Sequence, residues 1–194
     1  MNQRVLAAIA VVLIVLPLSG RSQQAPESAA SLPRPQLEQV SIVDVLEAAR
    51  RNSDRTFLVD HRVQPMIVTG QVPVREVDYP MLLAILRNND LAAVNADGIV
   101  YIVPSGIVRQ FPLPVLYEAN DSIHDEEWVT WILQMRNASP QSVVPIIRPM
   151  MPQAGHFAAE PGSQSVLIVD RYGNAKRIVA LIRELDGATP PQKR

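Results

Sequence analysis

The feature that most constrains the fold is a proline-interrupted stretch, residues 105–125, between two segments that carry helix and strand patterns. It contains Phe111–Pro112–Leu113–Pro114, and alternating prolines hold a chain in extended conformations. Such a stretch suits a semi-rigid linker or an edge strand. The whole chain has 194 residues, the length of one medium domain or two small ones. Because the proline-interrupted stretch separates two patterned segments, the sequence favours two domains, over residues 37–104 and 126–187.

The first of these segments has the pattern of a small α+β domain. Ser41 followed by Asp44 is typical of a helix N-terminus, and apolar residues continue from there at helical spacing. Thr56–Val59 is predicted to be a buried strand, and Met66–Val74 is β-rich with a bend expected at Gly70. The other predicted elements are a helix over Met81–Arg87, opened by Asp78 and Pro80, and a hairpin over Leu91–Pro104.

The second segment has a different order of elements, β-α-β-β-α. Asn174 is expected to cap its last helix, because Asn is a favoured residue at that position. The order resembles the KH-like topology of some RNA-binding modules, which hold nucleic acid with a Gly-x-x-Gly loop that this sequence lacks. Each segment is expected to form a sheet with two helices on one face, so the fold class is α+β. The predicted elements are strands over Trp128–Met135, His156–Glu160 and Ser165–Asp170, a short helix after Ser139–Pro140, and a helix to Leu185 with Ile178, Leu181, Ile182 and Leu185 as its buried stripe.

The sequence carries no pattern for catalysis, a metal or a cofactor. It has no Cys, and its three His residues lack the i, i+4 helical pairing that metal sites favour; they are His61, His124 and His156. It has no Gly-x-Ser-x-Gly nucleophile turn and no glycine-rich phosphate loop. The formal net charge of −1 gives no basic field for nucleic acid. We therefore expect a non-enzymatic protein with no catalytic, metal or cofactor-binding residues, no nucleic-acid partner and no small-molecule substrate.

Residues 1–22 are predicted to be a signal peptide. Arg4 precedes the uncharged run Val5–Leu18, which is shorter than the about 20 apolar residues that a spanning helix needs. A short membrane anchor is the alternative. Leu18–Ser19–Gly20 resembles a lipoprotein cleavage box, but Arg21 stands where that box requires Cys, so no lipid anchor is expected. Export predicts a periplasmic location. The other expected segments are a disordered leader, residues 23–36, and a frayed tail, residues 188–194.

Two sets of motifs can be compared with known protein families. They are Gln39–Leu46, Gly70–Val72 and Leu91–Pro104 in the first segment, and Ser165–Asp170, Asn174–Ile178 and Leu185–Asp186 in the second. Through these motifs, residues 37–187 resemble the periplasmic N-terminal domains of secretins, the outer-membrane channels of bacterial type II secretion. The second set of motifs follows a repeated secretin pattern of strand, Asp, Asn, helix and Leu-Asp. The resemblance implies that the first domain is related to the signalling domain of TonB-dependent receptors.

The resemblance also implies a function. In the family the first domain faces inner-membrane components, and the later small domains pack side by side into rings. We expect a periplasmic component of a type II secretion apparatus that binds inner-membrane partners, or assembles with secretin-type domains in a homo-oligomeric ring, in association with the outer-membrane complex. The sequence after Asp186 has no run of alternating strands for a channel, so the pore is not expected here. The alternative is a periplasmic signalling module related to the receptor domains.

Partner contacts are predicted as surfaces. The edge over Met66–Val74 is expected to accept a partner strand. The helix Asp78–Arg87 is a second predicted contact surface in the first segment, and the helix face Asn174–Arg183 is one in the second. Trp128 and Trp131 lie three apart on one strand and so face opposite sides. One is expected in the core; the other is either an exposed anchor, for which Trp128 is the candidate, or is covered by the linker. The predicted contact residues are Met66, Val68, Val72, Val74, Trp128, Lys176 and Arg177.

Overall fold

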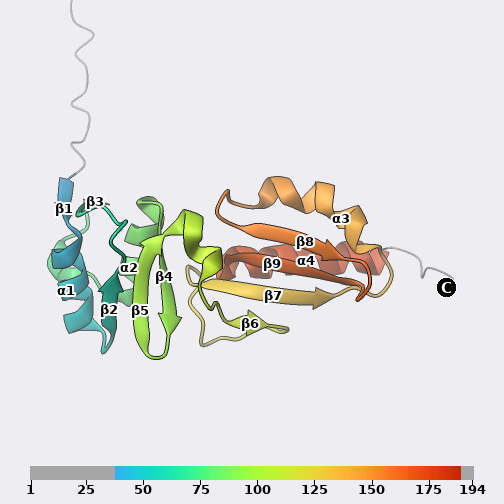
Figure 1. Ribbon diagram of the computed structural model, residues 1–194, viewed down its shortest axis with the longest axis horizontal. Coiled ribbons are helices and arrows are strands. Elements are labelled where there is room, and N and C mark those ends of the chain that lie inside the picture. The colour runs from blue at the N-terminus through green and yellow to red at the C-terminus, as the bar shows by residue number, and fades with distance from the viewer. Residues whose placement is uncertain (1–37, 189–194) are drawn as a thin grey trace, which may run out of the picture. The chain divides into compact units, whose positions relative to one another are not determined.

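The computed structural model describes residues 38–188 (Figure 1), so the predicted signal peptide, the leader and residues 189–194 lie outside it. We call the part from β1 to β5 the N-terminal lobe and the part from β6 to α4 the C-terminal lobe. The mixture of helices and strands confirms the α+β class. The domain boundaries proposed from the sequence stay a prediction.

The N-terminal lobe divides its strands over two sheets, where a single sheet was expected. Strands β1 and β3 pair antiparallel in one sheet, and the other has the order β2-β5-β4, with β2 parallel to β5. These pairings join residues far apart in sequence, which local patterns do not specify. The elements are β1 Glu38–Ser41, α1 Ile42–Asn52, β2 Thr56–Val59, β3 Met66–Gly70, α2 Tyr79–Asn88, β4 Leu91–Ala96 and β5 Ile99–Pro104.

The helix starts and the hairpin of this lobe form where the sequence predicts them. The Ser41 hydroxyl accepts a hydrogen bond from the Val43 N–H at 3.2 Å, and the Asp78 carboxylate accepts one from the Met81 N–H at 2.9 Å. Each side chain satisfies a backbone donor that the first helical turn leaves free. The hairpin turns at Asp97 and Gly98, whose φ angles of 53° and 80° lie in the left-handed region that two-residue hairpin loops require.

Strand β2 is an exposed edge strand, so the expectation of a buried strand at these residues is wrong. The side chain of Leu58 is 53% exposed, and Phe57 alone in this strand packs against the core. The strand order β2-β5-β4 leaves the outer side of β2 without a strand partner among the described residues. A short apolar run has the same composition at an edge as in the centre of a sheet, so the sequence could not separate the two.

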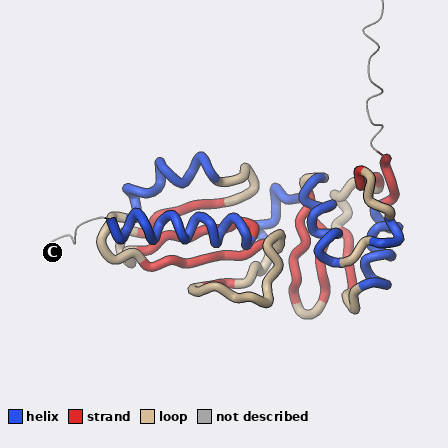
Figure 2. The backbone as a smooth tube through the Cα atoms, turned by 180° about the vertical axis from the view of Figure 1, so that it is seen from behind, coloured by secondary structure: helices blue, strands red, loops and turns tan. Residues whose placement is uncertain are grey.

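The C-terminal lobe has one sheet of order β6-β7-β9-β8, and α4 lies across one face of it (Figure 2). The predicted β-α-β-β-α order is confirmed, and β6 adds a short edge strand within the stretch expected as a linker or an edge strand. A 3-10 segment, Ser105–Gln110, precedes β6. The elements are β6 Val115–Leu116, β7 Trp128–Gln134, α3 Pro140–Ile147, β8 His156–Glu160, β9 Ser165–Arg171 and α4 Tyr172–Ala188.

Helix α4 begins earlier than predicted, so Asn174 lies inside the helix and does not cap it. The backbone carbonyls of Glu127 and Asp125 accept the N–H groups of Tyr172 and Gly173, both at 2.8 Å. A neighbouring loop therefore satisfies the first donors of the helix, and no side-chain cap is needed. Leu181, predicted in the buried stripe, is 37% exposed, and Val179 is buried instead.

The two tryptophans of β7 face opposite sides of the sheet, as predicted, but both are buried. Trp131 lies in the core between the sheet and the helices, stacked on Tyr172 with ring centroids 5.9 Å apart. Trp128 is only 2% exposed and belongs to a separate apolar cluster between the lobes. The prediction of Trp128 as an exposed anchor is therefore wrong. The alternative, cover by the linker stretch, is confirmed in part, because Val108 and Leu113 of that stretch cover Trp128 together with the N-terminal sheet. Within residues 38–188, no helix has both the length and the apolar character to span a membrane.

Candidate functional site

The candidate site lies where the two lobes meet, beside an apolar cluster that we call the junction cluster. Trp128 and Val169, on the sheet face opposite α4, contribute the C-terminal side. The N-terminal side comes from the outer face of the β4–β5 hairpin, and Val108 of the 3-10 segment and Leu113 are contributed by the stretch between the lobes. Burial of this cluster opposes separation of the lobes. Its buried members are Ala92, Val94, Val103, Val108, Leu113, Trp128 and Val169.

Glu126 joins the lobes beside this cluster. Its Oε1 lies 2.6 Å from Nη1 of Arg87 on α2, and its Oε2 lies 3.3 Å from Nε of Arg171 at the end of β9. The Arg171 guanidinium also lies 5.0 Å from the centre of the Trp128 ring, a cation–π contact. Burial lowers the pKa of Arg171, although Glu126 opposes that effect. Two guanidiniums thus share one carboxylate in a partly desolvated place.

Glu127 makes a second polar contact between the lobes. The Tyr79 hydroxyl donates a hydrogen bond to Glu127 Oε1 at 2.7 Å, and the Arg55 guanidinium lies 3.8 Å from the centre of the Tyr79 ring. Burial, followed by the bond to Glu127, raises the pKa of Tyr79. The phenol therefore stays protonated and acts as a hydrogen-bond donor.

Gly173 allows the loop before β7 to approach the start of α4. A Cβ atom at this glycine would lie 3.0 Å from Cβ of Asp125, tighter than ordinary contacts allow. The backbone bond from Gly173 N to Asp125 O depends on this approach. The close approach sets Asp125 and Glu126 at the edge of a pocket.

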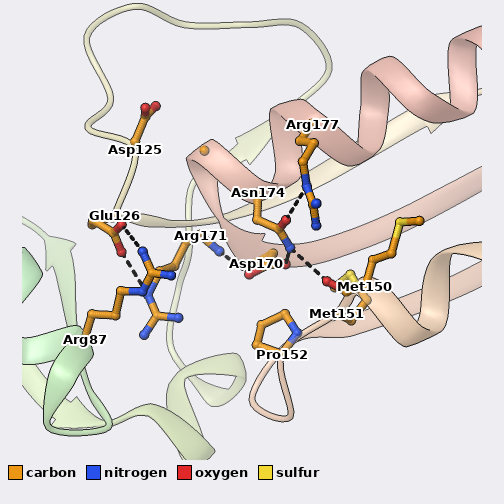
Figure 3. Close-up of a pocket in the computed structure, with 11 residues that line it drawn as sticks. Arg87, Asp125, Glu126, Met150, Met151, Pro152, Asp170, Arg171, Asn174 and Arg177 are labelled. Atoms are coloured by element: carbon orange, nitrogen blue, oxygen red, sulfur yellow. Dashed lines mark hydrogen bonds and ion pairs between the residues drawn. The ribbon is translucent and has the colours of Figure 1, made fainter.

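This junction pocket has a volume of about 610 Å³ and opens between the lobes (Figure 3). Arg87 comes from the N-terminal lobe, whereas Arg171, Asn174 and Arg177 come from the end of β9 and the first turns of α4. An apolar wall is formed by Met150–Pro152. The remaining lining residues are Asp125, Glu126, Asp170 and Gly173.

Asp170 is the buried carboxylate of the pocket, with only 1% of its surface exposed. It accepts hydrogen bonds from Asn174 Nδ2 at 2.5 Å and from the backbone N–H of Arg171 at 2.6 Å. Burial raises the pKa of Asp170, and the two hydrogen bonds only partly offset that rise. Asn174 in turn accepts a bond from Arg177 Nε at 3.0 Å. The chain Asp170–Asn174–Arg177 holds Arg177 at the rim.

The predicted contact residues of the N-terminal lobe are not gathered at this pocket. Met66 is 49% exposed on β3, and Val68 is half-buried. Val72 and Val74 follow β3 and pack partly against the core. The edge of β3 opposite β1 is closed at Val68, because the Asn89 side chain pairs with both the N–H and the C=O of this residue at 2.8 Å. A partner strand cannot pair with β3 at that position without displacing Asn89.

The two predicted basic contact residues of α4 are exposed and lie at or beside the junction pocket. Arg177 lines the pocket. Lys176 forms an ion pair with Asp125 at 2.6 Å and lies 4.5 Å from the centre of the Tyr172 ring. Whether these residues contact a partner stays a prediction. Arg87 ends the helix Asp78–Arg87 that the sequence suggests as a contact surface, but the sequence does not bring it together with Glu126 and Arg171, because their common location depends on the packing of the lobes.

The arrangement suits recognition by charge and shape. Within the described part of the chain, no group of three or more His, Asp or Glu side chains could hold a metal ion. The pocket instead brings guanidinium groups next to an apolar wall. Guanidinium groups recognise carboxylates through paired, charge-assisted hydrogen bonds.

Comparison with known proteins finds relatives that are secretins. Secretin XcpQ of Pseudomonas aeruginosa is 26% identical over 153 residues, which are 77% of this chain and 22% of XcpQ. Secretin ExeD of Aeromonas hydrophila is 27% identical over 190 residues, which are 93% of this chain and 26% of ExeD. The chain thus spans about a quarter of the length of these relatives. No family model matches it.

A solved structure has a similar fold. It is the Klebsiella pneumoniae type II secretion system outer membrane complex of PulD, PulS and the PulC HR domain. The TM-score is 0.64 at 19% identity, over 80% of this chain and 27% of that chain. The α+β architecture described above therefore occurs in an assembled secretion complex.

Proposed function

We propose, since the chain is homologous to the N-terminal domains of type II secretion secretins, that it is a non-enzymatic periplasmic component of a type II secretion apparatus. The observation that carries the proposal is the extent of the alignments. A match of 153 residues with XcpQ is longer than either lobe, so it includes residues of both. Homology across both lobes supports a role that uses them together.

The proposed partners are inner-membrane components of the apparatus and secretin-type domains, including further copies of this chain in a ring. The Klebsiella type II secretion outer membrane complex of similar fold contains PulD, PulS and the PulC HR domain. A protein with this fold is therefore found in a complex with other proteins. The outer side of β2 supports partner binding here, because it has no strand partner among the described residues and Leu58 is exposed.

A periplasmic signalling module is the less favoured function. The first segment alone resembles receptor signalling domains, whereas the matched secretins align over residues of the C-terminal lobe as well. The second domain, which the sequence predicts to be of the ring-building type, is an added part that a signalling module does not explain. The two functions differ in their partners, so one experiment separates them.

The test is crosslinking in the periplasm of the source bacterium, followed by purification of the tagged full chain and identification of the attached proteins. We expect secretion-apparatus components among them, and their loss when crosslinker is omitted from a parallel culture. Recovery of a TonB-dependent receptor or its signalling partners would instead support the alternative. Recovery of neither class would contradict both functions.

A further inference from the structure

We infer that β2 pairs with β2 of a second copy of this chain, in an antiparallel arrangement with a twofold axis at Leu58. The inference rests on the proposed function in one respect, because the association of copies is part of that function. It adds the strand, the register and the symmetry of the contact.

The backbone of β2 presents unpaired hydrogen-bonding groups on its outer side. The ladder between β2 and β5 continues to Asp60, whose N–H donates to the Ile102 carbonyl at 2.9 Å. Because successive residues of a strand direct their backbone groups to opposite sides, Leu58 also faces β5, whereas Phe57 and Val59 face outward. No strand occupies that side among the described residues (Figure 1). The N–H and C=O groups of these two residues are therefore available to another strand.

Two other strand edges of the chain are closed by side chains, and the edge of β2 is not. On β3, the Asn89 amide pairs with both backbone groups of Val68. On β8, the Phe157 carbonyl accepts a hydrogen bond from Arg148 Nη1 at 3.4 Å. Within the described part of the chain, no side chain makes such a bond to the outward-facing residues of β2. The strand also contains no Pro and no charged residue, which are features that keep edge strands from pairing.

One antiparallel register satisfies the backbone and the side chains together. In this register Phe57 of each copy lies opposite Val59 of the other, so these residues exchange both of their backbone hydrogen bonds. Leu58 lies opposite its own counterpart, at the non-hydrogen-bonded position where side chains approach most closely. Thr56 lies opposite Asp60. Each copy contributes the same residues, as a twofold contact requires.

The exposed face of β2 is complementary to itself in this register. Phe57 packs against the core. Because side chains alternate along a strand, Thr56 and Leu58 share the opposite face with Asp60. Leu58 is 53% exposed, and pairing with its counterpart would bury it. The Thr56 hydroxyl would donate to the Asp60 carboxylate of the second copy, which has acceptor positions beyond the two that bind the Arg62 side chain.

The contact is small, so we expect a weak dimer. β2 has only four residues, whereas a standard interface contains about 20–30 residues from each partner. Copies that are gathered in one assembly would pair more readily, because proximity raises their effective concentration.

Sedimentation equilibrium of the full chain tests the backbone part of the contact. We expect the wild type to form dimers at protein concentrations up to about 1 mM. Val59→Pro removes an outward-facing N–H, at a position where edge strands tolerate proline, and should weaken the dimer about tenfold. Val59→Thr is the matched control. It keeps the N–H and the shape of the side chain, so it should leave the dimer unchanged.

Disulfide crosslinking tests the register, since the chain has no cysteine of its own. Leu58→Cys places two thiols opposite each other, at a Cα separation of about 4.5 Å that a disulfide can span. Oxidised glutathione takes up the two electrons and two protons of these thiols and leaves as two glutathione thiols. Thr56→Cys is the matched control on the same face. Its two thiols lie about 13 Å apart along the strands, so it should crosslink at least about tenfold more slowly.

Three results would overturn the inference. They are a wild type that stays monomeric at the highest concentration, a dimer that Val59→Pro does not weaken, and equal crosslinking rates for Leu58→Cys and Thr56→Cys. Circular dichroism of each variant checks that it is folded. If Val59→Pro does not fold, the two crosslinking rates decide.

Failure of this inference is separate from failure of the proposed function. If the chain stays monomeric while crosslinking in the periplasm recovers secretion components, the function stands and the pairing is wrong. If the copies pair through β2 and no secretion component is recovered, the pairing stands and the proposed function is wrong.

Discussion

Asp186 shows how one side chain joins two elements of the C-terminal lobe. Its carboxylate accepts three backbone hydrogen bonds at 2.8 to 2.9 Å, from the N–H groups of Arg136, Asn137 and Ala138. These residues follow β7, whereas Asp186 lies near the end of α4. Burial would raise the pKa of Asp186, but the three bonds and the charge of Arg136 outweigh that effect and lower it.

Asp186→Asn should lower the free energy of unfolding at pH 7 by about 1–2 kcal/mol, because an amide replaces part of the acceptor surface with donors. Because the pKa of Asp186 is lowered in the folded state, its ionised carboxylate stabilises the fold at pH values above the ordinary pKa of Asp. This stabilisation is lost as the pH falls through the pKa that Asp186 has in the folded protein. The difference between variant and wild type should therefore shrink below about pH 4. Denaturant titrations at several pH values measure it. Glu184 is an exposed acid on the same helix. An equal loss of unfolding free energy in Glu184→Gln would contradict a specific stabilising role of Asp186.

Asn89 has the corresponding role in the N-terminal lobe. Its amide pairs with the backbone of Val68 on the edge of β3 that faces away from β1, and its Nδ2 also donates to the carbonyl of Ile85 at 2.8 Å. One side chain therefore takes the place of a neighbouring strand at that position. Exposed strand edges favour pairing with other chains, and closure of this one limits such pairing.

Asn89→Ala should lower the free energy of unfolding by about 1–3 kcal/mol and open the β3 edge to another chain. Thermal unfolding and light scattering test the two effects. Asn95→Ala is the control, since Asn95 is an exposed residue of β4. Unchanged stability together with unchanged self-association in Asn89→Ala would show that the edge closure has no energetic role.

At the scale of elements, the junction cluster lets β7 contribute to two separate cores. Its odd-numbered residues face the helices with Trp131, and Trp128 packs against β4, β5 and the 3-10 segment. Both tryptophans are almost fully buried, so replacing either one by Ala leaves a cavity. The cavity lies in the junction cluster for Trp128 and in the core of the C-terminal lobe for Trp131. Comparing the two substitutions therefore tests how the lobes are joined.

Trp128→Ala should destabilise the protein by about 3–5 kcal/mol, the usual effect of removing a buried aromatic ring. Hydrogen exchange should increase in the 3-10 segment and β4, whereas β8 and α4 remain protected. Trp131→Ala is the matched comparison and should increase exchange in α4 and β9. If both variants lose protection in the same elements, the two clusters do not act as separate cores.

The elements with local signals could be predicted from the sequence. Ser41 and Asp78 open their helices through their own side chains, and the Asp97–Gly98 turn fixes the hairpin. The start of α4 could not be predicted from Asn174, because distant carbonyls satisfy its first donors. The division of the N-terminal strands into two sheets also depends on distant pairing.

The candidate site was predicted only in part, for a related reason. Arg177 is one of the predicted contact residues, and it lines the pocket. Arg87 and Glu126 are 39 positions apart, and nothing in either local sequence indicates their ion pair. The burial of Trp128 likewise depends on the other lobe. Sites built between lobes are set by tertiary packing.

At the scale of the whole molecule, the two lobes share contacts that are both apolar and polar. Tyr79 and Arg87 of α2 reach Glu127 and Glu126, and the junction cluster lies beside them. Such joint packing favours one cooperative unit over two independent lobes.

A role in type II secretion is tested most directly by the amount of a type II substrate secreted by a strain that lacks the gene for this chain. We predict that the substrate accumulates in the periplasm and that expression of the wild-type chain restores secretion. Normal secretion by the deletion strain, with no periplasmic accumulation, would contradict a role in the type II secretion apparatus.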